Sequence, residues 1–439
     1  MKRSTSPPAT DHKKQKQIHP FFDNKSQSTK DDPAMRIKWY SGIPSVLIAQ
    51  TKEAKNVGSA KIAAFDLDST LITTKSGRTF AKDANDWKWW DSKIPQRLEE
   101  LHSTGYKIVV FSNQNGLNNI QRIAEFKRKV ADIFNQVRER VGVYETGLLT
   151  DGLYCYLKLS VPVILYAAMK KDRYRKPMTG MWDDMVKEHN DSVSIDLDQS
   201  FYVGDAAGRP DGWKHQAKKD HSCGDRKFAK NVNIPFYTPE AFFSKEKEAA
   251  FSWGDFDPHS YSLESVPLFT PTSTPLKLED TDAREMILFV GRPASGKSTF
   301  AKKHLIPDGY AYVNQDTLKT KAKCLKACED AIREKQSVVV DNTNGSMDTR
   351  AEFLKIAKKH DLPVRCFYFV ADTDLCRHNN YYRHINQGDR DLLSEIVFRT
   401  FKSRFQEPTM DEGYQEIKKI NFVFDGDDTD LAAWRKWYL

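Results

Sequence analysis

Two aspartates separated by one residue follow a short apolar segment in the first half of the chain. Asp66 and Asp68 stand in the sequence FDLDSTLI, directly after the apolar run at residues 61–65. Two carboxylates this close repel each other, so such a pair usually needs a cation between them or a shared proton. A bare pair of this kind is often only a solvated strand end, so its interpretation depends on the residues that follow.

Three further polar residues follow later apolar segments in the same half. Ser112 stands in FSNQNG, Lys176 in RKPMTGMW and Asp205 in VGDAAGRP. A hydroxyl, a cation and a third carboxylate at strand ends could together hold a phosphoryl group. Taken singly, Ser112 could be an ordinary strand-end hydroxyl and Lys176 a surface lysine, so it is their combination and order that favour a site.

A phosphate-binding loop is predicted in the second half. The sequence GRPASGKS at residues 291–298 matches G-x-x-x-x-G-K-[ST], between an apolar run at 286–290 and a helical stretch expected to start near Thr299. Glycines let backbone N–H groups surround phosphates, Lys297 would reach the β- and γ-phosphates, and Ser298 would bind Mg²⁺. This half is therefore predicted to bind ATP or GTP. The predicted loop residues are Gly291, Arg292, Pro293, Ala294, Ser295, Gly296, Lys297, Ser298 and Thr299.

A kinase also needs a base that faces the acceptor hydroxyl. A strand-like run at 310–314 leads directly to Asp316, which is the predicted base. The alternative is that Asp316 caps a helix beginning at Thr317. Arg377 and Arg383 stand six residues apart on a predicted helix and could close over the transferring phosphoryl group, or could be surface charges.

Another carboxylate, Asp341, follows a strand-like run at 337–340. It could hold the water shell of a magnesium ion beside the phosphate-binding loop.

The elements that must position these residues are strands alternating with helices. Apolar strands are expected to end at Phe65, Phe111, Val203, Val290 and Val340, with amphipathic helical stretches between them, such as 120–137 and 350–359. This alternation predicts an α/β fold with two parallel-sheet domains. Ligands of such sheets bind at the carboxyl ends of the strands, where the candidate residues stand.

Composition sets outer limits on the function. A chain of 439 residues is long enough for two or three domains, and its longest strongly apolar run, 161–169, is too short to span a membrane. Six scattered cysteines without a C-x-x-C pair predict reduced thiols rather than a zinc site. The formal charge of +8 is compatible with a polyanionic partner but does not require one.

The motifs of the first half resemble, in order, those of the haloacid-dehalogenase-like phosphatases. The resemblance implies that Asp66 is a nucleophile that forms an aspartyl-phosphate, and that Asp68 protonates the leaving oxygen with a raised pKa. It also implies Mg²⁺ held by Asp66, the backbone carbonyl of Asp68 and Asp205. Ser112 and Lys176 would stabilise the equatorial phosphoryl oxygens.

Two details of this resemblance bear on the site. Many relatives have a second aspartate soon after the third carboxylate, and three residues here could serve: Asp211, Asp220 or Asp225. Ser112 follows Asp66 by only 46 positions, which leaves no room for a large cap domain. An uncapped site can admit a macromolecule, so a phosphorylated polymer end is a more plausible substrate than a small sugar phosphate.

A protein that both removed and added phosphate at the same position of its substrate would achieve nothing. The two activities make sense together if they act on different ends of one polymer. From about Trp39 to Leu439 the chain resembles the bifunctional polynucleotide 3′-phosphatase/5′-kinases. The resemblance implies DNA strand-break repair, in which 3′-phosphates are removed and 5′-hydroxyls are phosphorylated with ATP. The motifs that carry it are FDLDSTLI, FSNQNG, RKPMTGMW, VGDAAGRP, GRPASGKS, NQDTLK, VVVDNTN and RHNNYYRH. The predicted division is a tail at 1–35, a phosphatase domain at 36–258, a linker at 259–282 and a kinase domain at 283–439.

Two other functions remain as alternatives. A small-molecule phosphatase fused to a small-molecule kinase would be expected to carry a cap domain. A repair scaffold with decayed sites would be expected to lack competent catalytic residues. Basic stretches at 170–176 and 214–219 could contact DNA phosphates, although charge runs are often solvated faces.

The first 35 residues are polar and basic and are predicted to be disordered. They leave no room for the forkhead-associated domain of animal relatives. Basic clusters at 2–3 and 13–16 look like a bipartite nuclear import signal, with a solvating tail as the alternative, so a nuclear location is expected. No heptad or exposed apolar stripe argues against a monomer, and no membrane partner is expected.

One motif in the tail suggests a protein partner. Gln15, Ile18, Phe21 and Phe22 have the spacing of the peptide that binds the replication sliding clamp, in which a short helical turn presents the apolar side chains to a pocket. Only these positions are constrained, so the clamp contact is a hypothesis.

Overall fold

The structure is a computed structural model of the whole chain. It describes residues 37–54, 57–138, 141–143, 156–158, 161–254, 256–262, 266–278, 283–386, 388 and 391–438. The tail with its candidate partner-binding residues, Gln15, Ile18, Phe21 and Phe22, lies outside the described residues.

Strands of the first half form one sheet that is parallel at its centre. In the described part of the chain, the sheet has seven strands in the order β1-β2-β9-β6-β3-β10-β11, with β1 and β2 antiparallel to their neighbours. The strands are β1 (Ile37–Tyr40), β2 (Val46–Thr51), β9 (Val163–Ala168), β6 (Tyr106–Asn113), β3 (Lys61–Phe65), β10 (Phe201–Val203) and β11 (Phe236–Tyr237). Two further pairs of short antiparallel strands lie outside it: β4 (Ile72–Thr73) with β5 (Lys88–Trp89), and β7 (Val141–Val143) with β8 (Tyr156–Lys158).

Alternation along the central strands directs side chains to two apolar layers. In β3, Ala63 and Phe65 pack with α1 (Ile94–Ser103) and α2 (Ile120–Arg138), whereas Ile62 and Ala64 face the opposite layer. That layer holds α3 (Gly180–His189) and α4 (Gly224–Val232), and α5 (Pro239–Ser244) joins the first one. Because helices cover both faces, the parallel strands are continuously apolar, and the polar residues collect at the strand ends.

The second half builds a smaller sheet of the same class. Among the described residues it has six strands in the order β12-β17-β16-β13-β15-β14, all parallel except β12. The strands are β12 (Phe269–Thr270), β17 (Glu416–Ile420), β16 (Val364–Phe369), β13 (Met286–Gly291), β15 (Val338–Val340) and β14 (Ala311–Val313). The helices are α6 (Lys297–His304), α7 (Gln315–Leu318), α8 (Lys321–Arg333), α9 (Met347–Lys359), α10 (Thr373–Asn386), α11 (Glu395–Arg404) and α12 (Asp428–Trp434). The prediction of two parallel-sheet α/β domains is therefore confirmed.

The segment predicted to be a linker, 259–282, differs from that expectation in its described part. Residues 266–278 lie along the second sheet, because β12 pairs with β17 and the ammonium group of Lys418 donates to the carbonyls of Pro271 and Thr274. Its prolines break the periodicity by which strands are recognised. An edge strand of two residues is also too short to show an alternating pattern of apolar residues.

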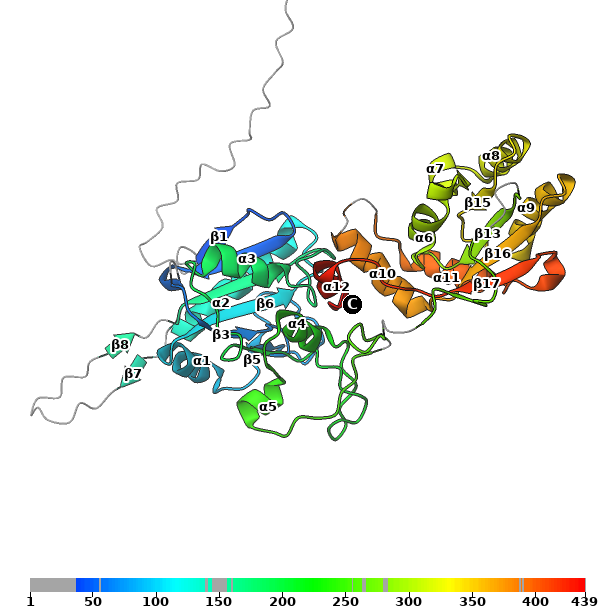
Figure 1. Cartoon of the computed structure of the whole chain (residues 1–439). Helices are drawn as coiled ribbons and strands as arrows, with labels where there is room; N and C mark the ends of the chain where they lie inside the picture. Colours follow the sequence, from blue (N-terminus) through cyan, green and yellow to red (C-terminus); the bar gives the residue numbers. More distant parts are fainter. Residues whose placement is uncertain are drawn as a thin grey trace, which may run out of the picture.

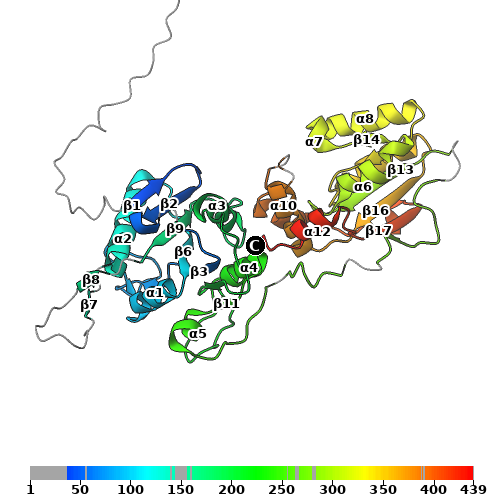
Figure 2. The same ribbon diagram turned by 60° about the vertical axis from the view of Figure 1, so that its left-hand side comes forward.

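The two domains meet through the end of the chain. Figure 1 and Figure 2 show α10 and α12 between the two sheets, with the C-terminus beside α4. The amide of Asn231 in α4 donates to Trp437 O and accepts from Trp437 N, each at 2.8 Å. Within the residues described, no helix is both long enough and apolar enough to cross a bilayer.

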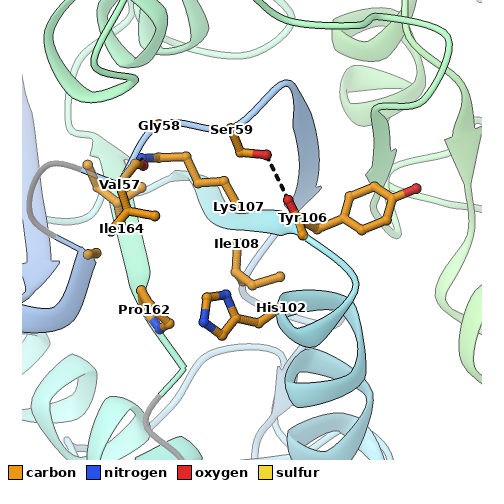
Figure 3. A pocket seen from close by; sticks show the side chains of 11 residues that line it. Val57, Gly58, Ser59, His102, Tyr106, Lys107, Ile108, Pro162 and Ile164 are labelled. Atoms are coloured by element: carbon orange, nitrogen blue, oxygen red, sulfur yellow. Dashed lines mark hydrogen bonds between the residues drawn. The ribbon is translucent and has the colours of Figure 1, made fainter. Parts of the chain in front are cut away.

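A cavity of about 210 Å³ lies at the opposite edge of the first sheet from the strand-end residues. Figure 3 shows its lining, including Ser59 and Lys107, where β3 and β6 begin. Lys107 Nζ donates to His189 O at 2.6 Å, and burial lowers the pKa of this ammonium group to about 8. It also donates to Val57 O at 2.5 Å, and these two contacts with backbone carbonyls indicate a structural role.

Candidate active sites

Carboxylates from separate segments converge at the carboxyl edge of the first sheet. Asp66 directly follows β3, Asp205 follows β10, and Asp225 lies in the first turn of α4. One carboxylate oxygen from each lies within 4.8 Å of the other two. These residues are here called the acidic cluster. Clustered carboxylate oxygens are the ligands that Mg²⁺ prefers, so the residues present fit the predicted ion.

A buried lysine holds two members of the acidic cluster. Lys176 Nζ lies 2.5 Å from Asp66 Oδ1 and 2.7 Å from Asp225 Oδ1. The same ammonium group donates to the hydroxyl of Tyr202 at 2.7 Å, and that hydroxyl lies 3.2 Å from Asp225. Asn113 fixes the backbone of Lys176 through a hydrogen bond in each direction, both 3.0 Å. The lysine is thus anchored to the end of β6 before any substrate binds.

Charge in this cluster is not balanced by the lysine alone. Burial raises the pKa of Asp66 to about 7, against the opposing effect of Lys176. Burial, together with the charges of Asp66 and Asp225, raises the pKa of Asp205 well above its usual range. Although burial disfavours its charge, Asp225 and Asp66 raise the pKa of Lys176. A divalent cation would relieve this excess of negative charge, which is a second reason why Mg²⁺ fits.

The structure distinguishes between the alternatives for the further carboxylate. Asp225 joins the acidic cluster, and its Oδ2 also accepts from the backbone N–H of Ala206 at 3.0 Å. Asp220 instead binds the guanidinium of Arg209 at 2.9 Å. Asp211 accepts the backbone N–H of Lys219 at 2.8 Å. Of these three residues, Asp225 is therefore the one placed to contact a metal ion.

Asp68 lies at the mouth of the site rather than inside it. Its side chain is 51% exposed, and its two oxygens accept from Gln114 Nε2 at 2.5 Å and from Lys129 Nζ at 3.2 Å. Gln114 also donates to the hydroxyl of Ser112 at 2.9 Å, so one amide links the predicted acid to the predicted phosphoryl-binding hydroxyl. An exposed carboxylate at the mouth can exchange protons with water and with a leaving group.

The phosphate-binding loop connects β13 to α6 in the second domain. Gly296 precedes α6 with a φ of 96°, a conformation in which a side chain would be strained. A Cβ atom on Gly291 would lie 2.8 Å from the Cβ of Phe369, so β16 also requires a glycine there. Lys297 Nζ donates to Gly291 O at 3.0 Å and to Arg292 O at 2.5 Å, and burial lowers the pKa of this ammonium group to about 8.

Polar residues at the ends of β14 and β15 lie beside the phosphate-binding loop and contact it. The carboxylate of Asp341 accepts from Ser298 Oγ and from the hydroxyl of Tyr312, each at 2.6 Å. Asn314 donates to the same carboxylate at 3.2 Å and to Asp341 O at 2.7 Å. A hydroxyl and a carboxylate beside a phosphate-binding lysine are a suitable donor set for Mg²⁺ with bound phosphates.

Asp316 lies in the first turn of α7, and it does not cap this helix. The cap is Asn314, whose side chain accepts the backbone N–H of Thr317, and the helix begins at Gln315. The alternative role as a cap is therefore wrong. Asp316 is exposed on the same strand-end edge as the phosphate-binding loop, where an acceptor hydroxyl could reach it.

The two arginines predicted to act together as a lid lie on different faces of α10. Residues six apart on an α-helix are separated by roughly 120° around its axis. The guanidinium of Arg377 contacts Glu395 at 2.7 Å and Asp374 at 2.9 Å. Arg383 contacts Asn380 at 3.0 Å, and its charge contributes to lowering the pKa of Lys297. Arg383 is thus placed to influence the phosphate-binding lysine, whereas Arg377 is engaged by two carboxylates.

Comparisons with known proteins agree with this geometry. The family model described as polynucleotide kinase 3 phosphatase matches residues 61–243, and an AAA domain model matches residues 286–408. A bifunctional polynucleotide phosphatase/kinase of Schizosaccharomyces pombe is 39% identical over 419 residues, which cover 95% of this chain and 92% of the relative. This chain belongs to the bifunctional polynucleotide phosphatase/kinase family.

Two further relatives match less than half of this chain. A polynucleotide 3′-phosphatase of Saccharomyces cerevisiae is 30% identical over 215 residues, covering 42% of this chain and 87% of the relative. A polynucleotide 3′-phosphatase of Arabidopsis thaliana is 36% identical over 208 residues, covering 47% of this chain and 27% of the relative.

Several side chains of the phosphatase/kinase sites were not predicted from the sequence. Gln114 stands inside the motif FSNQNG and could have been noticed for its distance of two residues from Ser112. Lys129 lies in the middle of α2, where nothing in the sequence distinguishes it from solvated lysines. Tyr202 resembles any aromatic residue of a buried strand. These contacts depend on how distant segments fold together.

Proposed function

We propose that this enzyme prepares DNA strand breaks for ligation, by removing a 3′-phosphate in the first domain and phosphorylating a 5′-hydroxyl with ATP in the second. The observation that carries the proposal is the presence, in one chain, of the acidic cluster around Lys176 and a phosphate-binding loop, with the predicted base Asp316 exposed in the first turn of α7. A DNA break that needs both reactions is a substrate that explains why the two sites occur together.

The phosphatase reaction would proceed in two steps. A carboxylate oxygen of Asp66 attacks phosphorus, the bond from phosphorus to the 3′-oxygen breaks, and Asp68 gives its proton to that oxygen. Water then attacks the aspartyl-phosphate, Asp68 takes a proton from this water, and inorganic phosphate leaves while the Asp66 carboxylate is restored. Ser112 and Lys176 hold the phosphoryl oxygens, where negative charge is present throughout.

Mg²⁺ would be held in the first domain by the acidic cluster of Asp66, Asp205 and Asp225. When bound, it would neutralise charge between the carboxylates and the phosphate. Lys176 holds two of these carboxylates in place, because its ammonium group lies 2.5 Å from Asp66 and 2.7 Å from Asp225.

In the second domain, the residues of the chain position two substrates. Backbone N–H groups of the loop and Lys297 hold the phosphates of ATP, and Ser298 with Asp341 provides oxygens for a magnesium ion. Asp316 would accept the proton of the 5′-hydroxyl as this oxygen bonds to the γ-phosphorus and ADP leaves. Arg383, which lies on α10, would contact the phosphoryl group during its transfer.

The open mouth of the first site favours a polymer end as substrate. Between Asp66 and β6 the chain forms only the short strands β4 and β5 and the helix α1, so this interval holds no cap domain. The loop between β4 and β5 presents Phe80 with 83% of its surface exposed. An exposed aromatic ring on a loop that follows the nucleophile strand suits stacking with a terminal base.

The test uses a nicked duplex bearing a 3′-phosphate and a 5′-hydroxyl, incubated with ATP and Mg²⁺, with each strand weighed by mass spectrometry. One strand should lose a phosphate and the other should gain one. Asp66→Ala should abolish only the loss, and Lys297→Ala only the gain. If both masses stay constant while nucleosides and generic phosphatase substrates are turned over, the small-molecule fusion is the better explanation.

The basic tail supports two further parts of this proposal. Its basic clusters suit nuclear import, and Gln15, Ile18, Phe21 and Phe22 suit docking to the replication sliding clamp. A fluorescence-anisotropy titration of a peptide covering residues 10–30 against the clamp tests the second part. Binding should be lost with Phe21→Ala and Phe22→Ala together, and binding that survives this change would exclude the docking.

A further inference from the structure

We propose that residues 211–219, here called the basic loop, bind the phosphodiester backbone of the polynucleotide on the internal side of its 3′-phosphate. This inference rests on the proposed function, since it adds a second contact to the substrate of the same phosphatase site. The loop leaves the carboxyl edge of the first sheet shortly after Asp205, where the acidic cluster lies. A polynucleotide strand whose 3′-phosphate lies at Asp66 must cross this edge of the sheet.

The base of the basic loop is fixed directly to the catalytic edge. Arg209, which is only 5% exposed, donates from Nε to Asp220 at 2.9 Å, from Nη1 to Glu240 at 2.7 Å, and from Nη2 to Asp205 O at 3.2 Å. The carboxylate of Asp220 also accepts the backbone N–H of Ala207 at 3.1 Å. Both ends of the loop are therefore tied to the segment that carries the metal-site carboxylate.

The tip of the loop is also ordered by its own contacts. Gly212 N donates to Ala217 O at 2.9 Å, and Trp213 Nε1 donates to Lys218 O at 3.2 Å. The guanidinium of Arg209 lies 3.8 Å from the centre of the Trp213 ring. A loop that is already ordered loses little conformational entropy when it binds, so its cations are available at a small cost.

Two lysines of the basic loop face solvent without an acidic partner. Lys214 is paired with Glu246 at 2.9 Å. Lys218 and Lys219 are exposed, and among the described residues neither ammonium group contacts a carboxylate. The nearest acid in sequence, Asp220, is engaged by Arg209, and Asp211 accepts the backbone N–H of Lys219. Unpaired lysines on an ordered loop that is tied to the segment after Asp205 match a chain of phosphates.

The experiment compares Lys218→Gln/Lys219→Gln in the full-length enzyme on two substrates, a 3′-phosphorylated oligonucleotide and a nucleoside 3′-monophosphate. For the oligonucleotide at low salt, the KM of the variant should rise about tenfold, because two phosphates are no longer neutralised. Between about 50 and 200 mM salt, the KM of the variant should therefore increase roughly tenfold less than that of the wild type. For the nucleoside monophosphate, which has no internal phosphate, KM and kcat should be unchanged.

Two control variants test whether the effect depends on the position of the lost lysines or only on the net charge of the protein. Lys214→Gln should have a smaller effect, because its ammonium group is already paired with Glu246. Lys323→Gln/Lys326→Gln removes the same charge from two exposed lysines of α8 and should leave both substrates unaffected. Equal losses on both substrates, or none on either, would overturn the inference. A wild-type enzyme that does not dephosphorylate the oligonucleotide would instead contradict the proposed function.

Discussion

Lys176 determines the geometry of the phosphatase site at the level of single residues. Its ammonium group contacts Asp66 and Asp225, which come from β3 and α4, and Asn113 ties its backbone to β6. Removing any one of these charges leaves the others buried without their partner, which is costly. The cluster is therefore expected to respond strongly to substitution of residues that never touch substrate.

Asp225→Asn should abolish most of the 3′-phosphatase activity and spare the kinase. The amide keeps the size of the side chain but removes a charged oxygen of the acidic cluster, so we expect kcat to fall by at least about 100-fold. Both activities are measured on the nicked duplex at saturating Mg²⁺.

Asp220→Asn is the control, because this residue binds Arg209 outside the acidic cluster. It should lower the free energy of unfolding while retaining a kcat close to the wild type. If Asp220→Asn lost the phosphatase reaction and Asp225→Asn did not, the assignment of the metal site would be wrong.

Arg383→Gln and Arg377→Gln should differ sharply in the kinase reaction. Arg383 influences Lys297, and loss of an arginine that contacts the transferring phosphoryl group lowers kcat by about 10³-fold. Arg377 is engaged by Glu395 and Asp374 near the surface, so its loss should change kcat by less than about threefold. Single-turnover kinetics with ATP measure the two variants, and equal effects would contradict the division of α10 into two faces.

Helix α10 contacts both the phosphate-binding loop and the C-terminal segment. Near its centre, Asn379 Nδ2 donates to Ala294 O of the phosphate-binding loop at 3.4 Å. Its neighbour His378 is buried on another face, where it hydrogen-bonds Trp434 O at 2.7 Å and packs against Phe256. One helix thus connects the phosphate-binding loop to the packing of the C-terminus.

The packing of α10 against α12 should weaken in acid. Burial lowers the pKa of His378 to about 4, partly offset by the carbonyl of Trp434. The unfolded chain binds a proton near pH 6.5 and the folded chain does not, so stability falls as pH decreases from about 6.5 to 4. The total loss is about 3 kcal/mol.

Urea unfolding of wild type and His378→Gln across this pH range measures the effect. Glutamine can still donate to Trp434 O but does not titrate, so the variant should show a flatter pH dependence. His221→Gln, at an exposed position, is the control and should behave as the wild type. An unchanged slope in His378→Gln would exclude this histidine as the source.

For the whole molecule, the two active sites are joined by the C-terminal segment 434–438. The amide of Asn231 donates both to Trp437 O and to Pro177 O, each at 2.8 Å, and Pro177 directly follows Lys176. At the other end of the segment, Trp434 Nε1 donates to Asn379 Oδ1 at 2.8 Å. The ring of Trp437 also stacks on Trp253 at 5.1 Å. The sites are chemically separate but share a structural support.

Trp437→Ala should separate the unfolding of the two domains. The ring is buried, and removing it costs about 3 kcal/mol or more, nearly all of it at the contact between domains. Differential scanning calorimetry should show one transition for the wild type and two for the variant, with ATP raising only the transition of the kinase domain. A single transition in Trp437→Ala that ATP shifts as a whole would contradict this role.

The sequence by itself determined the local parts of this protein. Apolar runs predicted the central strands, since strands buried on both faces are continuously hydrophobic. The phosphate-binding loop was predictable because its glycines and lysine act within eight consecutive residues, 291–298. Asp66, Ser112, Lys176 and Asp205 could be grouped because parallel strands bring their carboxyl ends to one edge.

Only the tertiary structure decided the contacts that depend on direction and on distant segments. Asp211, Asp220 and Asp225 are chemically equal in the sequence, but only the last is turned by α4 toward the acidic cluster. The angle between Arg377 and Arg383 around α10 places them on different faces of this helix. Residues 266–278 lie along the second sheet because β12 pairs with β17. Such choices are made by packing between residues far apart in the chain, which local patterns do not record.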